Sequence, residues 1–275
     1  MNSGYLNSIL EQMPESARKK WEDYKKLSPE ERVKRDIETY NSETVENTDG
    51  GINCDICHNK RLISYLDDNG QQSFKNCICV RQRALYTQMK QSGAANPDTY
   101  TLEKYKANTD WQKHIKQKAV DFLESDNKAW FFIGGQVGAG KTHICTAILL
   151  KLLSDGKRCK YMSWTQEVAR LNTLVNDINY GQAIKEFKEP EVLYIDDLFK
   201  HRKGEQPTSG EINRAFEILQ YRYNNGLATI ISSEKTISEL IEIDEATGSR
   251  ISERAGKQFT INIKSDPQKN YRLKP

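Results

Sequence analysis

The fold of this chain is decided by the stretch Ala129-Trp130-Phe131-Phe132-Ile133-Gly134-Gly135-Gln136-Val137-Gly138-Ala139-Gly140-Lys141-Thr142. The apolar run before Gly134 is typical of a buried strand, and the apolar residues after Thr142 recur as they do on a helix. Between them, residues 135–142 match the phosphate-binding pattern G-x4-G-K-[ST] in its required strand–loop–helix context. The stretch therefore predicts an α/β fold with a parallel sheet.

The chemistry of a bound polyphosphate explains the spacing in this loop. Glycines let backbone N–H groups close around phosphate oxygens, and the start of the following helix adds a favourable dipole. We expect Lys141 to reach the β and γ phosphates and Thr142 to hold Mg²⁺. The nucleotide is expected to contact Gly135, Gln136, Val137, Gly138, Ala139, Gly140, Lys141 and Thr142.

A second apolar run, Val192-Leu193-Tyr194-Ile195, ends in Asp196 and Asp197. This pattern indicates a buried parallel strand that delivers acids at its carboxyl end. We expect Asp196 to orient Mg²⁺, and Asp197 to orient or deprotonate the attacking water. Because Asp197 is one methylene shorter than a glutamate, slow ATP hydrolysis suited to a switch is expected.

A third strand, Ala228-Thr229-Ile230-Ile231-Ser232-Ser233, is predicted beside the acid-bearing strand. In a P-loop ATPase such a strand places a polar side chain near the γ-phosphate. Ser233 is the candidate, with Ser232 as the alternative, and a simple helix cap would also explain these serines. Further on, Arg250 and Arg254 lie on one helix face. Either could act as an arginine finger toward a neighbouring subunit, and solvated surface arginines are the alternative.

Four of the six cysteines fall in one short segment as two pairs, Cys54 with Cys57 and Cys77 with Cys79. Four thiolates at one point suit a structural, tetrahedral Zn²⁺ site. Four ordinary buried cysteines are the alternative, and the neighbouring His58 is a less favoured ligand.

The turn signal Asn69-Gly70 lies between the two cysteine pairs. It predicts a β-hairpin in which both central residues have positive φ. The hairpin would bring the pairs together at its open end. On a strand, Cys77 and Cys79 would then face the same side.

Composition leaves the partner open. A net charge of +3 does not by itself indicate a nucleic-acid binder. Two basic clusters could contact phosphates or be solvated: Lys157, Arg158 and Lys160, and Lys200, Arg202 and Lys203. No apolar run reaches the roughly 18 residues of a membrane span, and the N-terminus lacks a signal-peptide pattern. We therefore expect no membrane partner and a cytoplasmic location, where cysteines favour metal over disulfides.

Two regions are predicted, with residues 1–95 forming a helical and zinc-binding domain and residues 96–275 an ATPase domain. Ser28-Pro29-Glu30-Glu31 reads as a capped helix start. The segment 41–53 reads as a linker, and residues 92–97 are expected to break a helix over 80–91. An apolar stripe near the N-terminus packs on the protein itself or docks a partner; its residues are Leu6, Ile9, Leu10, Met13, Ala17, Trp21 and Tyr24.

Together these features resemble the DnaC/DnaI family of bacterial and phage helicase loaders. The resemblance rests on the two cysteine pairs, the phosphate-binding loop running into His143, Ile195-Asp196-Asp197-Leu198, the helix end Tyr221-Arg222-Tyr223-Asn224 before Thr229-Ile230-Ile231-Ser232-Ser233, and Gly248-Ser249-Arg250-Ile251-Ser252-Glu253-Arg254. It implies an AAA+ core that binds ATP between self-associated subunits, preceded by N-terminal helices and a zinc-binding hairpin that grips a hexameric replicative helicase. Single-stranded DNA would run along the inner face of the assembly.

The resemblance also assigns individual residues. Arg254 is the better arginine-finger candidate, Arg272 resembles the family's sensor arginine within the same subunit, and His143 joins the nucleotide site. Glu234 departs from the pattern, because many family members carry asparagine there. The implied function is ATP-dependent loading of the helicase onto single-stranded DNA, in a bacterial cell, from a chromosomal or phage gene.

Two other functions fit a phosphate-binding loop. An IstB-type transposition-accessory ATPase shares the core but more often lacks the cysteine hairpin. A small-molecule kinase would give the cysteines no role and would need an arginine-rich lid.

Overall fold

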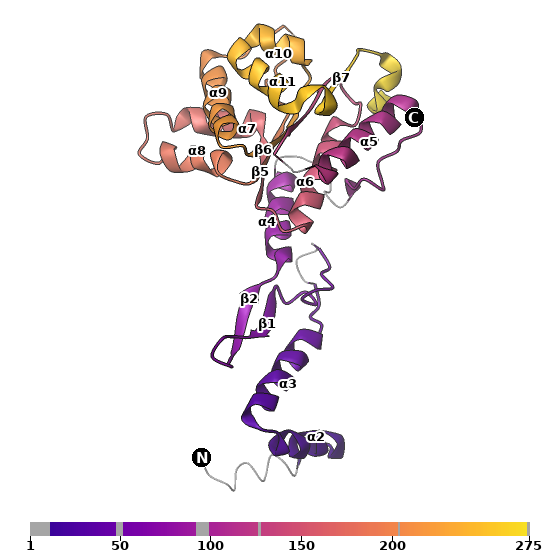
Figure 1. Cartoon of the computed structure of the whole chain (residues 1–275), viewed down its shortest axis with the longest axis vertical. Helices are drawn as coiled ribbons and strands as arrows, with labels where there is room; N and C mark the ends of the chain where they lie inside the picture. The colour runs from indigo at the N-terminus through magenta and orange to yellow at the C-terminus, as the bar shows by residue number, and fades with distance from the viewer. Residues whose placement is uncertain (1–11, 48–51, 92–98, 126–127, 203, 274–275) are drawn as a thin grey trace. The chain divides into compact units, whose positions relative to one another are not determined.

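The computed structural model describes residues 12–47, 52–91, 99–125, 128–202 and 204–273 (Figure 1). The chain divides by its internal contacts into two compact units, Met1–Val80 and Arg81–Pro275. The predicted division at residue 95 lies later in the chain than this boundary. The boundary is earlier because helix α4 (Ile78–Gln91) places Leu85 and Met89 in the core of the larger unit. The predicted helix break over 92–97 lies outside the described residues.

A five-stranded parallel sheet forms the centre of the larger unit, in the order β4-β5-β6-β3-β7. Its strands are β3 (Trp130–Gly135), β4 (Cys159–Ser163), β5 (Val192–Asp196), β6 (Ala228–Ser232) and β7 (Thr260–Ile263). Strand β6 lies between β3 and β5, with Ile133 opposite Ser232 and Ile195 opposite Ile231. This register brings the phosphate-binding loop and the acid pair to the same edge of the sheet, as predicted.

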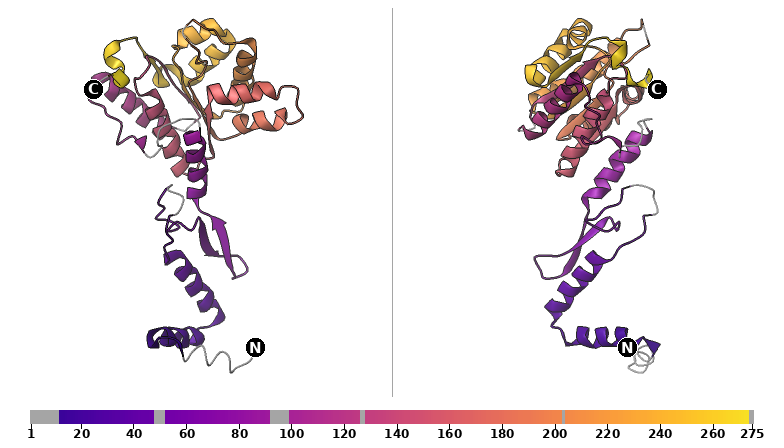
Figure 2. Two further views of the ribbon diagram at one scale, coloured as in Figure 1. Left: turned by 180° about the vertical axis from the view of Figure 1, so that it is seen from behind. Right: turned by 90° about the vertical axis from the view of Figure 1, so that its right-hand side faces the viewer.

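Helices cover both faces of this sheet (Figure 2). They are α5 (Asp110–Glu124), α6 (Lys141–Ser154), α7 (Trp164–Thr173), α8 (Tyr180–Lys188), α9 (Ser209–Asn224), α10 (Ile237–Ile243) and α11 (Glu245–Phe259). The chain moves from β3 to β4 in one direction across the sheet and from β4 through β7 in the other. Since parallel crossovers are right-handed, α6 lies on one face and α7 to α11 on the other.

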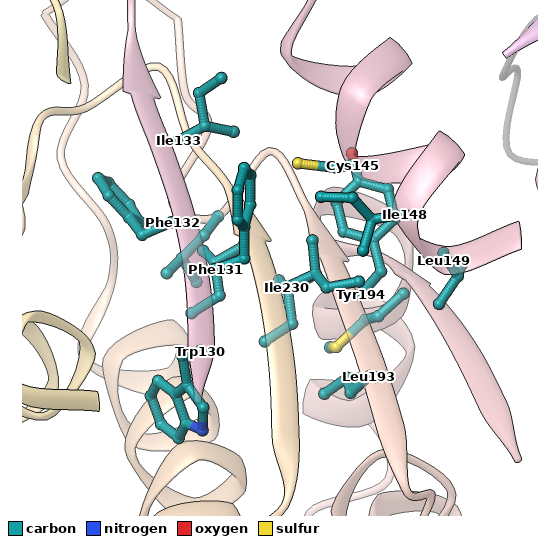
Figure 3. Close-up of a cluster of buried hydrophobic side chains, with 14 of the residues drawn as sticks. Trp130, Phe131, Phe132, Ile133, Cys145, Ile148, Leu149, Leu193, Tyr194 and Ile230 are labelled. Atoms are coloured by element: carbon teal, nitrogen blue, oxygen red, sulfur yellow. The ribbon is translucent and has the colours of Figure 1, made fainter. Parts of the chain in front are cut away.

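The core lies between the sheet and these helices (Figure 3). Trp130, Phe131 and Ile133 of β3 are fully buried, and Ile148 of α6 is buried with them. This near-continuous apolar run is what a strand covered on both faces requires. Phe122 of α5 packs edge-on against Phe131, so α5 joins the same core.

Arg222, near the end of α9, is a fully buried cation whose partners are carbonyl oxygens and one hydroxyl. Its guanidinium donates to Lys188 O at 3.0 Å, Pro190 O at 2.8 Å and Thr229 Oγ1 at 3.0 Å. Burial lowers the pKa of Arg222 to about 9. Because these partners lie near the starts of β5 and β6, Arg222 ties these two neighbouring strands to α9.

The smaller unit contains α2 (Glu15–Lys26), α3 (Pro29–Ser42), and an antiparallel hairpin of β1 (Leu62–Leu66) and β2 (Gln72–Asn76). The capping box predicted at Ser28 and Glu31 is present. Three residues of the predicted apolar stripe lie outside the described residues: Leu6, Ile9 and Leu10. None of the described helices is both long and apolar enough to cross a membrane.

The hairpin turn differs from the prediction. Gly70 has a φ of +73°, but Asn69 does not have a positive φ. The Asp67 carboxylate instead accepts hydrogen bonds from the backbone N–H groups of Asn69 and Gln71. This side-chain-supported turn is longer than the two-residue turn that Asn-Gly usually makes, because Asp67 supplies a competing local acceptor.

Candidate nucleotide site and cysteine cluster

The phosphate-binding loop is a tight turn between β3 and α6. Gly135 has a φ of +99° and Gly138 a φ of +73°. A Cβ on Gly135 would lie 2.2 Å from Ile263 O, and one on Gly138 would lie 2.0 Å from Asn270 Oδ1. Only glycine is compatible with these positions, because the backbone is left-handed and the neighbours are close.

Lys141 begins α6 and is buried under the loop. Its Nζ donates to Gly135 O and Gln136 O, both at 2.8 Å. Burial lowers the pKa of Lys141, although the Asp197 and Glu234 charges act in the opposite direction. The ammonium group therefore lies where the loop closes, as a phosphate ligand requires.

Asp196 is a buried carboxylate held by four hydroxyl groups. Ser232 donates to its Oδ1 at 2.6 Å, Tyr194 to Oδ1 at 2.5 Å and Tyr161 to Oδ2 at 3.0 Å. The hydroxyl of Thr142 lies 3.3 Å from Oδ1. Burial, with the Asp197 charge, raises the pKa of Asp196. A hydroxyl and a carboxylate side by side are oxygen ligands that suit Mg²⁺, so these two predicted residues fit the ion.

Asp197 lies directly beyond the end of β5 and points to a lysine. Lys200 Nζ is 2.5 Å from Asp197 Oδ2 and 3.2 Å from Glu234 Oε1. The sequence indicates Lys200 only as a member of a basic cluster. The other cluster is also paired with acids in the structure, since Lys160 contacts Glu186 at 3.0 Å.

Two adjoining cavities of about 290 and 810 Å³ lie at this edge of the sheet. Residues common to both linings are Tyr100, Thr142, Asp197, Lys200 and Arg272. The smaller cavity is lined by residues 137–143, and the larger one includes Asp196. Their size is in the range of ligand sites, and their lining fits a nucleotide with its metal.

Two residues assigned by resemblance also line the cavities. Arg272 lines both of them, on the segment whose Tyr271 N–H donates to Gly138 O at 3.0 Å. His143 lines the smaller one, with its Nε2 2.9 Å from Thr101 O. Burial lowers the pKa of His143, so its ring is neutral at pH 7.

The structure does not bring the Ser233 side chain to the cavities. Ser233 is fully buried, and its hydroxyl donates to Leu198 O at 2.7 Å and accepts from Lys235 N. Ser232, the alternative, contacts Asp196 and also accepts from Asp197 N at 3.0 Å. Glu234, the residue that departs from the family pattern, lines the smaller cavity.

Arg254 and Arg250 lie on α11 and line neither of the two cavities. Arg254 donates to Lys128 O, and the Arg250 guanidinium lies 5.3 Å from the Phe216 ring centre. Neither arginine reaches the nucleotide site of its own chain. The prediction that one of them acts on a neighbouring subunit stays a prediction.

The cysteine cluster lies at the open end of the hairpin. The Sγ atoms of Cys54 and Cys77 are 3.7 Å apart, and those of Cys57 and Cys79 are 3.5 Å apart. All four lie within 4.8 Å of one another and are buried, and His58 is not part of the group. Tetrahedral zinc with bonds of about 2.3 Å places its sulfurs about 3.8 Å apart, so the cluster fits zinc.

The backbone around the cysteines differs from the prediction. Strand β2 ends at Asn76 and helix α4 begins at Ile78, so Cys79 lies in the first turn of a helix and not on a strand. Burial works to raise the pKa of Cys54, but hydrogen bonds from backbone N–H groups outweigh it and lower the pKa. Burial raises the pKa of Cys77. A cation would favour the thiolate form of both.

Comparison with known proteins identifies the family of the chain. A family model described as IstB-like ATP binding protein matches residues 65–260, which include the phosphate-binding loop and the acid pair. The chain belongs to the IstB-like ATP-binding protein family. This assignment and the geometry of the loop confirm the prediction of an ATPase.

Relatives of this IstB-like protein include two from Bacillus subtilis (strain 168). The uncharacterized protein YqaM is 32% identical over 215 residues, which are 72% of this chain and 66% of that protein. The phage-like element PBSX protein XkdC is 29% identical over 218 residues, which are 74% of this chain and 80% of that protein. The match thus spans just under two thirds of YqaM.

The fold of the IstB-like protein is similar to a crystal structure of the DnaC helicase loader. The TM-score is 0.52 at 19% identity, over 62% of this chain and 98% of that chain. This likeness confirms the predicted AAA+ fold.

Replacing Lys141 with alanine should abolish ATP binding, because the loop would lose its buried ammonium group. Calorimetric titration with Mg-ATP measures the loss. Zinc content per chain, measured on the same sample, should be unchanged, because the cysteines belong to the other unit. Loss of zinc in this variant would contradict the independence of the two sites.

Proposed function

We propose that this chain is an ATP-dependent loader that places a hexameric replicative helicase on single-stranded DNA. The observation that carries the proposal is the pairing of an AAA+ unit, similar in fold to the DnaC helicase loader, with a separate four-cysteine unit. In this proposal the cysteine unit binds the helicase and the ATPase unit controls release. Such work belongs in the cytoplasm of a bacterial cell.

The nucleotide site suits a switch. Lys141 would hold the phosphates, and Thr142 and Asp196 would hold Mg²⁺. ATP would bind one conformation of the assembly more tightly than another, and this difference in binding free energy would shift the assembly between the two conformations. Asp197 would orient water, but its contact with Lys200 has to loosen before the carboxylate can act as a base. Slow turnover is therefore expected.

A transposition-accessory ATPase is the second candidate, because the matching family model is described as IstB-like. That match begins at residue 65, so it includes Cys77 and Cys79 but leaves out Cys54 and Cys57. The cysteine cluster is thus completed only by residues outside the matched region, and its completeness favours the loader. The family assignment leaves the small-molecule kinase without support.

We also propose that subunits associate through the ATPase unit and that Arg254 contacts the ATP of a neighbour. Replacing Arg254 with alanine should preserve ATP binding but lower assembly-dependent hydrolysis by about 1,000-fold or more, the scale expected of an arginine finger. Turnover measured over a range of protein concentrations tests this. A variant that keeps the wild-type rate and concentration dependence would remove Arg254 from the role.

Binding to a bacterial replicative helicase tests the loader proposal. The whole chain should bind a hexameric helicase in an ATP-dependent way, whereas a chain beginning at Arg81 should keep ATP binding but lose the helicase. Residue 81 is chosen because a later start would remove Leu85 and Met89 from the ATPase core. Sedimentation of the mixture measures the complex.

If neither chain binds helicase while both hydrolyse ATP in response to DNA, the transposition-type function is favoured. A control chain with Phe74→Ser removes an exposed aromatic side chain from β2. It shows whether binding of the helicase depends on non-specific hydrophobic contact with the hairpin.

A further inference from the structure

Lys200 occupies the centre of an acidic cluster in the nucleotide site. Its ammonium group contacts Asp197 at 2.5 Å and Glu234 at 3.2 Å. These acids come from different loops, one after β5 and one after β6. The lysine lines the smaller cavity together with Lys141 and the larger one together with Asp196. It therefore faces the space in which the phosphates are proposed to bind.

The backbone is strained in a way that holds Lys200 there. Asp197 has a φ of +59° and Phe199 a φ of +54°, although neither is glycine. Such left-handed positions persist only when their surroundings enforce them. Leu198 and Phe199 are fully buried, and Lys200 N–H donates to Asp197 O at 3.1 Å, closing the turn. The strain is thus offset by burial of the two apolar residues, and the turn sets the lysine over the carboxylate.

The charges around the site require such a cation. Asp197 and Glu234 would repel a polyphosphate if no cation lay between them and the ligand. Glu234 stands where the resemblance expects a neutral asparagine, so this chain carries one more negative charge at the site. Hydrogen bonding to Asp197 raises the pKa of Lys200 against the effect of burial, so the side chain remains an ammonium ion.

We propose that Lys200 is a second phosphate-binding cation and that, with Glu234, it replaces the sensor asparagine as the group that distinguishes ATP from ADP. This inference rests on the proposed binding of ATP at this site. Lys200 contacts Asp197, the proposed water-orienting residue, so its ammonium lies toward the terminal phosphate. When it turns to that phosphate it releases the Asp197 carboxylate, which couples nucleotide recognition to activation of water.

The test measures binding of Mg-ATP and Mg-ADP to the whole chain by calorimetry. A non-hydrolysable ATP analogue is titrated in parallel, so that heat from ATP hydrolysis is not counted as heat of binding. Lys200→Met keeps the length of the side chain but removes its charge. It should weaken ATP binding by about 10-fold or more, the scale of a lost charged hydrogen bond, and ADP binding by less than about threefold. Lys200→Arg should recover part of the preference for ATP.

Lys185→Met is the matched control, since Lys185 is an exposed lysine of α8 that lines neither of these two cavities nor the neighbouring one that Lys200 shares with Gln136 and Glu234. It should leave both affinities unchanged. Equal losses for ATP and ADP in Lys200→Met, or no loss for ATP, would overturn the proposal. Failure of the ATP site itself is distinguishable, because Lys141→Ala would then leave both nucleotides bound.

Discussion

The buried Asp196 carboxylate is the group on which the nucleotide site depends. Its hydrogen-bond donors come from separate elements, with Tyr161 on β4, Tyr194 on β5, Ser232 on β6 and Thr142 on α6. A buried charge is costly unless it is satisfied in this way, so the four elements must meet with the correct register. The parallel sheet supplies that register, so the nucleotide site forms only when the strands of the fold are correctly paired.

Much of this arrangement follows from the sequence, because its signals are local. A phosphate-binding loop between a strand and a helix determines which residues surround the phosphates, and an apolar run ending in Asp196 determines where the acids lie. The neighbouring positions of β3, β5 and β6 follow from the general architecture of such proteins. The four clustered thiols follow from cysteine spacing, since few other arrangements explain it.

The parts that could not be predicted depend on contacts between distant residues. Whether Ser232 or Ser233 lies beside Asp196 depends on the register of β6 against β5, and a run buried on both faces has no alternation to reveal that register. The role of Lys200 depends on the left-handed turn at Asp197, which residue types alone would disfavour. Cys79 lies on a helix because α4 begins at Ile78, directly after the hairpin.

We propose that ATP binding by the ATPase unit governs the loading of a ring-shaped helicase, and loading onto closed circular single-stranded DNA tests this proposal most directly. A circle has no end to thread, so a preformed ring must be opened or assembled around it. Helicase should become bound to the circle, in a form resistant to high salt, only when this protein and ATP are both present. Equal amounts of bound helicase with and without the protein would contradict the claim.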